Sequence, residues 1–515
     1  MVRPEAAQVG TPYGSLDFYR RRCSLLRGRP RRRRPSRVAP CAARPDHQAR
    51  PAASGTDMAP KATKQPDSDP RTAGRPCVQV SASDLSRRSS GQRAKAVTQH
   101  KHLLVFAPCA FNLAETSRMV EIAKGVSRDP VGSALFDVHF ISDGGEFESM
   151  IEKNAFALTR MEPRLTPEKI EHIARVDRGE EFSPAFTDTE MIERVQNELA
   201  ALSRLHPVAV ITGSYPSIPV TCRVLKAPLV WVVQSTWLPD FFEHGAGMTD
   251  GVRPALLKAV ADRCVLAFIN IWIRHGFLNT VNRAAEHFKV PGYRSIFEYW
   301  RGDITLVAEP PGFSGVKLPP NHFFTGPLVP QDEFPLPSQI VAMPRDRPLI
   351  YFAMGSSGTP EIVARLIESF EGKAYRVIAP VKFQLARLPG VRVPSNVLVT
   401  DWLPALQVNK MVDLAVIHGG VGTVMTAALA GKPVVGVGMQ IEQVANLACL
   451  ERLGFAVRVP KSKNPSAKVQ KAIARLLHDD AARAKAAAFA SSIAEWDGPK
   501  LATLKLVEHF AARRS

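Results

Sequence analysis

Short apolar runs alternate with helix-like segments from Lys101 onward, and this alternation limits the possible folds more than any other feature. Runs such as HLLVFAP and FDVHFIS are almost continuously apolar, as in strands that are covered on both faces. Between such runs, LAETSRMVEIAKGV and DTEMIERVQNELAALSRL carry apolar residues at helical spacing. The pattern predicts a doubly wound α/β domain over residues 101–330.

The same alternation begins again after the proline-rich segment TGPLVPQDEFPLPSQIVAMPRDRP. LIYFAM, YRVIAPV and NVLVTDWL are strand-like, and PEIVARLIESF is helical in its spacing. We predict a linker over 331–348 and a second domain over 349–515 that ends in helices. The expected fold is therefore α/β, with two Rossmann-like doubly wound domains facing a cleft. Ligands of such domains bind outside the carboxyl ends of the strands.

Residues 1–100 have a different composition from the rest of the chain. They hold 21 Lys and Arg against 7 Asp and Glu, whereas the other 415 residues hold 46 against 41. Low apolar content with high charge predicts a disordered basic extension. Three origins stay open for it: a true start at Met58, an organelle transit peptide, or a functional basic arm. Since the charge excess is confined to this extension, we expect no nucleic-acid partner.

The cysteines and apolar runs bear on the cellular setting. Seven cysteines without a CxxC pair are typical of reduced thiols, not of a disulfide framework or a zinc site. No apolar stretch approaches the length of a membrane-spanning helix. We therefore expect a cytoplasmic chain with at most peripheral membrane contact, and an organelle as the alternative if the extension is a transit peptide.

Glycine is concentrated in VIHGGVGTVMTAALAGKPVVGVGMQIEQVANL, where residues 416–447 include six glycines. Gly419, Gly420 and Gly422 fall at a predicted strand-to-helix turn. The first amides of a helix lack partners and favour an anion, and glycine lets a phosphate approach closely. His418 and Thr423 can add side-chain donors. The chain has no GxxxxGK[ST] motif and no complete GxGxxG motif, which weighs against a P-loop or a dinucleotide site. Tight packing around a core histidine remains the alternative.

The pattern HGGxGTxxxAxxxGxPxV followed by EQxxN resembles the nucleotide-sugar glycosyltransferases of the GT-B fold. It is most similar to family-1 UDP-glycosyltransferases and to bacterial macrolide and flavonoid glycosyltransferases. IYFAMGSSG, NVLVTDWLP and FFTGPL match the same group, and the resemblance runs from Lys101 to the C-terminus. It implies transfer of a hexose from a UDP- or TDP-sugar to a hydroxyl of a small, lipophilic acceptor. It also implies inversion at the sugar, with no metal and no further cofactor.

The resemblance also implies roles for individual residues. Trp402 would stack on the base while the main chain near Leu403 reads its edge. Glu442 and Gln443 would hydrogen-bond sugar hydroxyls, and His418 would be catalytic as well as donor-binding. The residues implied around the diphosphate are Gly355, Ser356, His418, Gly419, Gly420, Gly422 and Thr423.

The chain departs from the family pattern at the general base. The family has a histidine after the first strand, and alignment on the first helix puts Glu115 there. The aspartate that orients this histidine is replaced by Gly213–Ser214, so we predict Glu115 as the base. A carboxylate with the ordinary pKa of about 4.3 is a weak base unless burial raises that pKa. Thr426 stands where the family often has a ribose-binding glutamate. The acceptor is expected near WLPDFFEHGAG and the apolar segment 255–282.

Two other functions stay open. The first is a nucleotide-sugar epimerase or hydrolase of the same fold, which would need further carboxylates at the sugar. The second is a non-catalytic partner subunit, because the histidine–aspartate dyad is missing. We expect a monomer or a homodimer.

Overall fold

The structure is a computed structural model that describes residues 101–512, except 178–179, 331–334, 356–358 and most of 244–274. The predicted basic extension, residues 1–100, lies outside the described residues. The same holds for most of the apolar segment in which we expected part of the acceptor site, and for part of the predicted linker.

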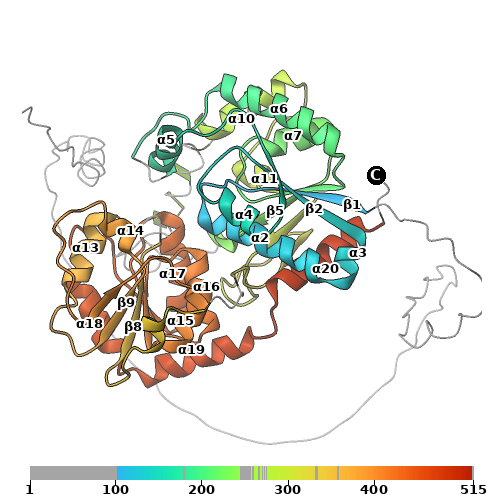
Figure 1. Ribbon diagram of the computed structural model, residues 1–515. Helices are drawn as coiled ribbons and strands as arrows, with labels where there is room; N and C mark the ends of the chain where they lie inside the picture. Colours follow the sequence, from blue (N-terminus) through green and yellow to red (C-terminus); the bar gives the residue numbers. More distant parts are fainter. Residues whose placement is uncertain are drawn as a thin grey trace, which may run out of the picture. The chain divides into compact units, whose positions relative to one another are not determined.

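The N-terminal domain is built on a seven-stranded parallel sheet with the order β3-β2-β1-β4-β5-β6-β7 (Figure 1). Its central strands are buried on both faces, which explains why their sequences are continuously apolar. The strands are β1 (His102–Ala107), β2 (Phe136–Ser142), β3 (Ala157–Arg160), β4 (Ala209–Thr212), β5 (Leu229–Val233), β6 (Ile304–Val307) and β7 (His322–Phe324).

Helices connect these strands and cover both faces of the sheet. The helix after β1 begins where the Asn112 side chain accepts hydrogen bonds from the backbone N–H groups of Ala114 and Glu115. The helices are α2 (Leu113–Arg128), α3 (Pro130–Leu135), α4 (Glu148–Lys153), α5 (Pro167–Asp177), α6 (Asp188–Leu205), α7 (Ile218–Leu225), the 3-10 turn η1 (Ser235–Trp237), α8 (Pro239–Glu243), α10 (Phe277–His287) and α11 (Ile296–Tyr299).

The C-terminal domain has a six-stranded parallel sheet with the order β10-β9-β8-β11-β12-β13. Counted from its own first strand, this is the order of the first six strands of the N-terminal sheet. Two Rossmann-like domains are thus confirmed. The elements are α12 (Ser338–Val341), β8 (Leu349–Ala353), α13 (Pro360–Glu368), β9 (Arg376–Ala379), α14 (Lys382–Leu385), β10 (Val397–Val399), α15 (Ala405–Met411), β11 (Leu414–Ile417), α16 (Val421–Leu429), β12 (Val434–Gly436), α17 (Ile441–Leu453), β13 (Ala456–Arg458), α18 (Ser466–Leu476), α19 (Asp480–Ser492) and α20 (Gly498–Phe510).

Each sheet reverses its strand order between two central neighbours. In the N-terminal sheet these are β1 and β4, and in the C-terminal sheet they are β8 and β11. The loops that follow such a pair diverge to opposite faces and leave a crevice at the carboxyl ends. Glu115 follows β1 and Ser214 follows β4, whereas Gly355 follows β8 and His418 follows β11. The topology therefore puts all four residues at the places where ligands bind in this class of fold.

The last helix differs from the prediction, which grouped all terminal helices with the second domain. Helix α20 instead packs along α2 and α3 of the N-terminal domain (Figure 1). Its residues Ala502, Leu506 and Phe510 are buried in the core of the N-terminal sheet. The contact with α2 is close, because a Cβ at Gly125 would lie 2.6 Å from the carbonyl oxygen of Pro499. A helix's apolar face predicts that it packs, but not on which domain.

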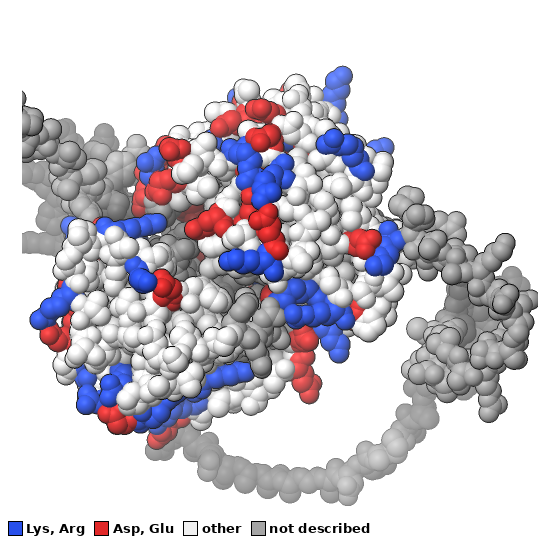
Figure 2. Space-filling view, in the orientation of Figure 1, with Lys and Arg blue, Asp and Glu red and all other residues white. Residues whose placement is uncertain are grey.

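Positive and negative side chains are interspersed on the molecular face shown in Figure 2. Ion pairs at the surface of the described residues include Lys382 with Asp401 and Arg376 with Asp346. This mixture agrees with the near balance of charge that the sequence has beyond residue 100.

Candidate active site

A cavity of about 1070 Å³ is lined by residues of both domains. It lies where the loops after β1, β4, β8 and β11 meet. Leu403 is buried in the C-terminal core and Gly419 lies beneath the turn, so neither lines the cavity, and Ser356 lies outside the described residues. The predicted site residues that line it are Glu115, Gly355, Trp402, His418, Gly420, Gly422, Thr423, Glu442 and Gln443.

The glycine-rich turn after β11 opens α16 toward the cavity. Gly420 is the N-cap of α16, and its helix start has no side-chain cap. Gly419 has φ +96°, and a Cβ there would lie 2.6 Å from the carbonyl oxygen of Gln443, so its role is to let α17 approach. Gly422 has nothing within 4 Å of its Cβ position. The turn therefore offers free amides beside an open space, as a phosphate site requires.

His418 is buried behind this turn. Its Nδ1 lies 3.3 Å from the carbonyl oxygen of Ala353, and because a carbonyl only accepts, Nδ1 carries the proton. Burial lowers the pKa of His418 to about 4, so the ring is neutral at neutral pH. In this state Nε2 is an acceptor. The sequence led us to expect that His418 donates a hydrogen bond to a diphosphate. Nε2 can do so only when the ring carries a second proton, and a neighbouring anion favours that protonation.

Thr423 and Gln443 use their polar groups within the protein. The Thr423 hydroxyl donates to the Gly420 carbonyl oxygen at 2.8 Å. The Gln443 side-chain oxygen accepts from the backbone N–H groups of Met439 at 2.9 Å and Gln440 at 3.3 Å, which caps the start of α17. Both side chains thus shape the helix starts, and their contacts with a donor stay predictions.

Gln234 joins the two domains at the cavity. Its side-chain nitrogen donates to Glu442 at 2.9 Å, and its oxygen accepts from Asn446 at 3.2 Å. Asn446 also donates to the Gly419 carbonyl oxygen at 3.1 Å, so one amide ties α17 to the glycine turn. No sequence motif marked Gln234 as a site residue. The feature that could have identified it from the sequence is its position as the first polar residue after the fully buried strand β5.

Glu115 is buried at the start of α2, with 1% of its surface exposed. Its Oε1 accepts from the backbone N–H groups of Ser214 at 2.8 Å and Cys109 at 3.2 Å, and its Oε2 accepts from the Ser214 hydroxyl. Burial raises the pKa of Glu115, while the Ser214 hydrogen bond and the Arg118 charge oppose this rise. A carboxyl group with a raised pKa is a better general base near neutral pH.

Ser214 and Arg118 are further neighbours of Glu115, and no role was predicted for either from the sequence. Ser214 stands where the family aspartate was expected, and the structure shows that it still contacts the candidate base. A Cβ at Gly213 would lie 3.1 Å from the Glu115 Oε1, so a small residue there keeps the carboxylate in place. Arg118 could have been noticed as a charged residue on the buried face of an amphipathic helix.

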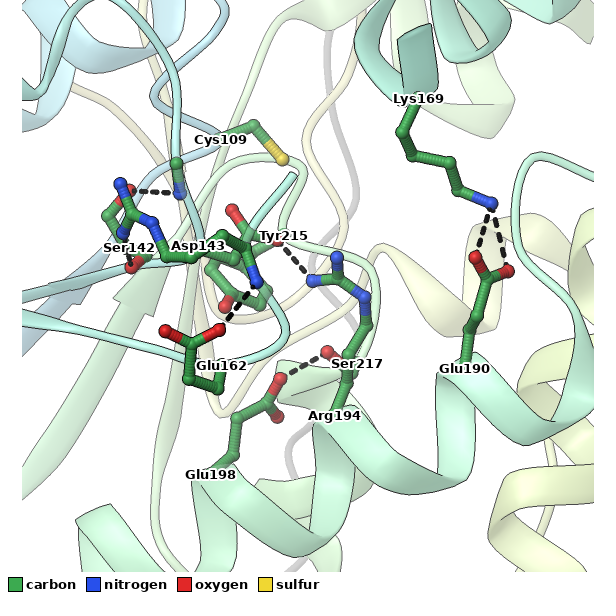
Figure 3. A network of polar contacts seen from close by, with 12 residues as sticks. Cys109, Ser142, Asp143, Glu162, Lys169, Glu190, Arg194, Glu198, Tyr215 and Ser217 are labelled. Carbon is green, nitrogen blue, oxygen red and sulfur yellow. Dashed lines mark hydrogen bonds and ion pairs between the residues drawn. The ribbon is translucent and has the colours of Figure 1, made fainter. Parts of the chain in front are cut away.

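A buried polar network lies beside the cavity in the N-terminal domain (Figure 3). Arg194 on α6 forms an ion pair with Asp143, which follows β2 and lines the cavity. One turn along α6, Glu198 accepts hydrogen bonds from the hydroxyls of Ser217 and Thr221. Burial raises the pKa of Glu198 to about 8, so it is a neutral acid at mild pH. This network fixes the loops after β2 and β4, which carry the cavity wall.

Residues 377–508 match the family described as erythromycin biosynthesis protein CIII-like, C-terminal domain. The chain is 24% identical over 442 residues to the PGL/p-HBAD biosynthesis glycosyltransferase of Mycobacterium tuberculosis. The aligned region covers 82% of this chain and 97% of that protein. This chain has the fold of spinosyn forosaminyltransferase SpnP, with a TM-score of 0.56 and 17% sequence identity. The match covers 80% of this chain and 100% of SpnP. Spinosyn rhamnosyltransferase SpnG complexed with thymidine diphosphate matches with TM-score 0.54, 14% identity, and coverage of 79% and 100%.

The chain is a glycosyltransferase of the GT-B fold. In this glycosyltransferase the family match falls in the C-terminal domain, where it includes the glycine turn and α17. The departures from the family pattern, Glu115 and Ser214, lie in the N-terminal domain.

Two further observations concern the described part of this glycosyltransferase. Within it, no three His, Cys, Asp or Glu side chains are grouped so that they could hold a metal ion. None of its described helices is both long enough and apolar enough to cross a membrane. Metal independence itself stays a prediction.

Proposed function

We propose that the protein transfers a hexose from a UDP- or TDP-sugar to a hydroxyl of a small lipophilic acceptor, with inversion and without a metal or other cofactor. One observation carries this proposal. A buried carboxyl, Glu115, and the open turn at Gly420 and Gly422 line the same cavity from opposite domains. A base and a diphosphate site that face each other are what a direct displacement needs.

The donor end of the cavity supports a nucleoside diphosphate. Trp402 lines the cavity with 54% of its surface exposed, as suits an aromatic side chain that stacks on a base. The free amides at the start of α16 suit the diphosphate. Glu442 lines the cavity near this turn and can accept from sugar hydroxyls. The structural relative SpnG is complexed with thymidine diphosphate, so thymidine and uridine are both candidates for the nucleoside of the donor.

The acceptor end of the cavity is apolar and rich in aromatic rings, which supports a lipophilic acceptor. Trp237 and Trp300 stack there with ring centroids 4.8 Å apart. The apolar lining residues from the N-terminal domain include Phe111, Met150, Leu165, Ile173, Phe186, Trp237, Phe277, Ile296, Tyr299 and Trp300.

The proposed chemistry is a single displacement. Glu115 takes the proton of the acceptor hydroxyl, and the acceptor oxygen forms a bond to the anomeric carbon of the sugar. The bond from that carbon to the β-phosphate oxygen breaks, and the electron pair leaves with the nucleoside diphosphate. Attack opposite the leaving group inverts the anomeric centre. Amides that are already oriented toward the diphosphate stabilise the charge that develops on it.

The test is to incubate the full-length protein with UDP- and TDP-sugars and a panel of hydroxylated aromatic and polyketide acceptors, with mass spectrometry of the products. Glycosylated acceptor supports the proposal, and the NMR coupling of the anomeric proton reports inversion. Unchanged turnover in EDTA supports metal independence. Conversion of donor without acceptor would favour the epimerase or hydrolase. Donor binding without any turnover would favour a non-catalytic subunit.

A further inference from the structure

Arg118 is a buried cation at the cavity wall, and two of its three guanidinium nitrogens have no hydrogen-bond partner. It lies on α2 one turn beyond Glu115, has 6% of its surface exposed, and lines the cavity. Its Nε and Nη1 atoms have no hydrogen-bond partner. Among the described lining residues, only Asp143 also has a buried polar side-chain atom without a partner, and Asp143 is already paired with Arg194. Leaving buried N–H groups unpaired is costly, so a ligand oxygen is the expected partner of Arg118.

The rest of the described lining offers little positive charge for a diphosphate. Arg118 and Lys410 are its only Lys or Arg residues. Lys410 is exposed at the end of α15, on the segment that continues from Trp402, and therefore belongs to the base end of the cavity. His418 is neutral at neutral pH because burial lowers its pKa to about 4. Arg118 is thus the one buried cation that this described lining can direct at a ligand.

Arg118, Glu442 and the glycine turn line the same cavity. Burial lowers the pKa of Arg118, and the charges of Glu115 and Glu442 oppose that shift. Glu442 is within 3.4 Å of Asn446, which in turn donates to the Gly419 carbonyl oxygen at 3.1 Å. Glu442, which lines the cavity together with Arg118, is thus joined through Asn446 to the turn at which the diphosphate is expected.

We propose that Arg118 binds the β-phosphate of the nucleotide-sugar donor and neutralises the charge that builds on the diphosphate as it leaves. The inference rests on the proposed function. A guanidinium presents parallel N–H donors that match two phosphate oxygens. When the bond between the anomeric carbon and the β-phosphate oxygen breaks, the electron pair stays on that oxygen. Arg118 then holds a more negative group than it does in the bound donor, which favours the transition state over the ground state.

The test compares ligands that differ by the β-phosphate. Affinities for UDP and UMP, or TDP and TMP if thymidine binds better, are measured by calorimetry for wild type, Arg118→Met and Arg118→Lys. We expect Arg118→Met to weaken diphosphate binding about 10- to 100-fold, as for loss of a charge-assisted hydrogen bond. Monophosphate binding should stay within about twofold, because the nucleoside and its first phosphate lie beyond Arg118. Arg118→Lys should recover part of the diphosphate affinity because it keeps the charge but not the planar donors.

Turnover gives a second readout. With a working donor and acceptor, Arg118→Met should lower kcat by about 10²–10³-fold, the range for removing a preorganised donor to a developing anion. Lys410→Met is the matched control, since it removes the other lining cation of the described residues and should leave the ratio of diphosphate to monophosphate affinity unchanged.

The outcomes separate the two proposals. If wild type binds neither UDP nor TDP, the proposed function fails first. If wild type binds and turns over but Arg118→Met loses diphosphate and monophosphate affinity equally, Arg118 has a structural role and the inference is wrong. Unchanged affinity for both nucleotides would also overturn it. If Arg118→Met fails to fold, Arg118→Lys provides the test. A wild-type kcat and a wild-type ratio of diphosphate to monophosphate affinity in Arg118→Lys would show that the guanidinium is not needed.

Discussion

The backbone N–H of Ser214 donates a 2.8 Å hydrogen bond to Oε1 of Glu115, and the Ser214 hydroxyl donates to the other carboxylate oxygen. The resemblance to the family led us to expect a histidine and an aspartate in this place. A histidine base becomes a cation when it takes a proton, so a neighbouring carboxylate stabilises it. A glutamate base becomes neutral, and a second carboxylate beside it would repel its active form. A serine that donates hydrogen bonds suits a glutamate base in the way that an aspartate suits a histidine base.

Glu115→Gln should lower kcat by about 10²–10⁴-fold, the usual contribution of a general base. The amide has the same shape but cannot take the acceptor proton. Donor binding should persist, because the proposed donor contacts are made by Trp402, the glycine turn and Arg118 and not by Glu115. Initial rates measure the loss of turnover, and thermal shifts with UDP or TDP measure donor binding. Full turnover in this variant would show that Glu115 is not the base.

Ser214→Ala should move the acidic limb of the kcat/KM profile to higher pH. The serine hydroxyl stabilises the charged carboxylate and so lowers the pKa of Glu115, which burial raises. Without it, the pKa of Glu115 rises further, and the base stays protonated to higher pH. Rates across pH 5 to 9 in both proteins provide the measurement. Ser214→Thr keeps a hydroxyl and serves as the control, while an unshifted limb in Ser214→Ala would exclude this coupling.

Two neighbouring glycines should respond oppositely to alanine. Gly422→Ala adds a methyl group in open space on α16, so folding should be unaffected or improved by up to about 1 kcal/mol. Its methyl enters the proposed phosphate space and should weaken UDP or TDP binding. Gly419→Ala should lower the unfolding midpoint, since its φ of +96° and the Gln443 carbonyl oxygen leave no room for Cβ. Unfolding midpoints with and without nucleotide would reveal whether the two effects separate in this way.

Glu309 should make stability depend on pH. Its Oε1 accepts from the Ser235 backbone N–H at 2.6 Å, its Oε2 has no partner, and burial raises its pKa to about 7. A raised carboxyl pKa means that the native state holds the proton more tightly than the unfolded state. The stabilisation is complete in acid and is lost as pH rises through about 7. The loss by pH 8 is of order 3 kcal/mol.

Glu309→Gln cannot ionise and should therefore lose less stability than wild type between pH 5 and pH 8. Chemical unfolding at several pH values compares the two proteins. Some decline should remain in the variant, because the pKa of Glu198 is raised to about 8 by burial. Parallel stability curves for the two proteins would show that Glu309 does not titrate in this range.

Much of the fold follows from local sequence patterns. The apolar runs predicted β1, β2, β8, β9 and β10, and the glycine motif located the turn into α16. The short strands β3, β6, β7 and β13 were not identified, because three or four residues alone do not distinguish a strand from a loop. The equally short β10 was predicted because it lies in the longer run NVLVTDWL.

The site was less predictable because its contacts join distant parts of the chain. Glu115 and Ser214 are 99 residues apart, and Gln234 and Glu442 are 208 apart. Residue types alone also do not reveal which contacts a side chain makes within the protein. The Thr423 hydroxyl and the Gln443 side chain satisfy the ends of their own helices, which only the backbone geometry reveals.

The return of α20 to the N-terminal domain has a consequence for engineering. The polypeptide passes from one domain to the other twice, once before β8 and once between α19 and α20. Swapping donor specificity with a related enzyme by cutting at a single junction near residue 348 would leave a foreign helix against α2. A hybrid should therefore take 349–497 from one parent and keep 498–510 with the acceptor domain of the other.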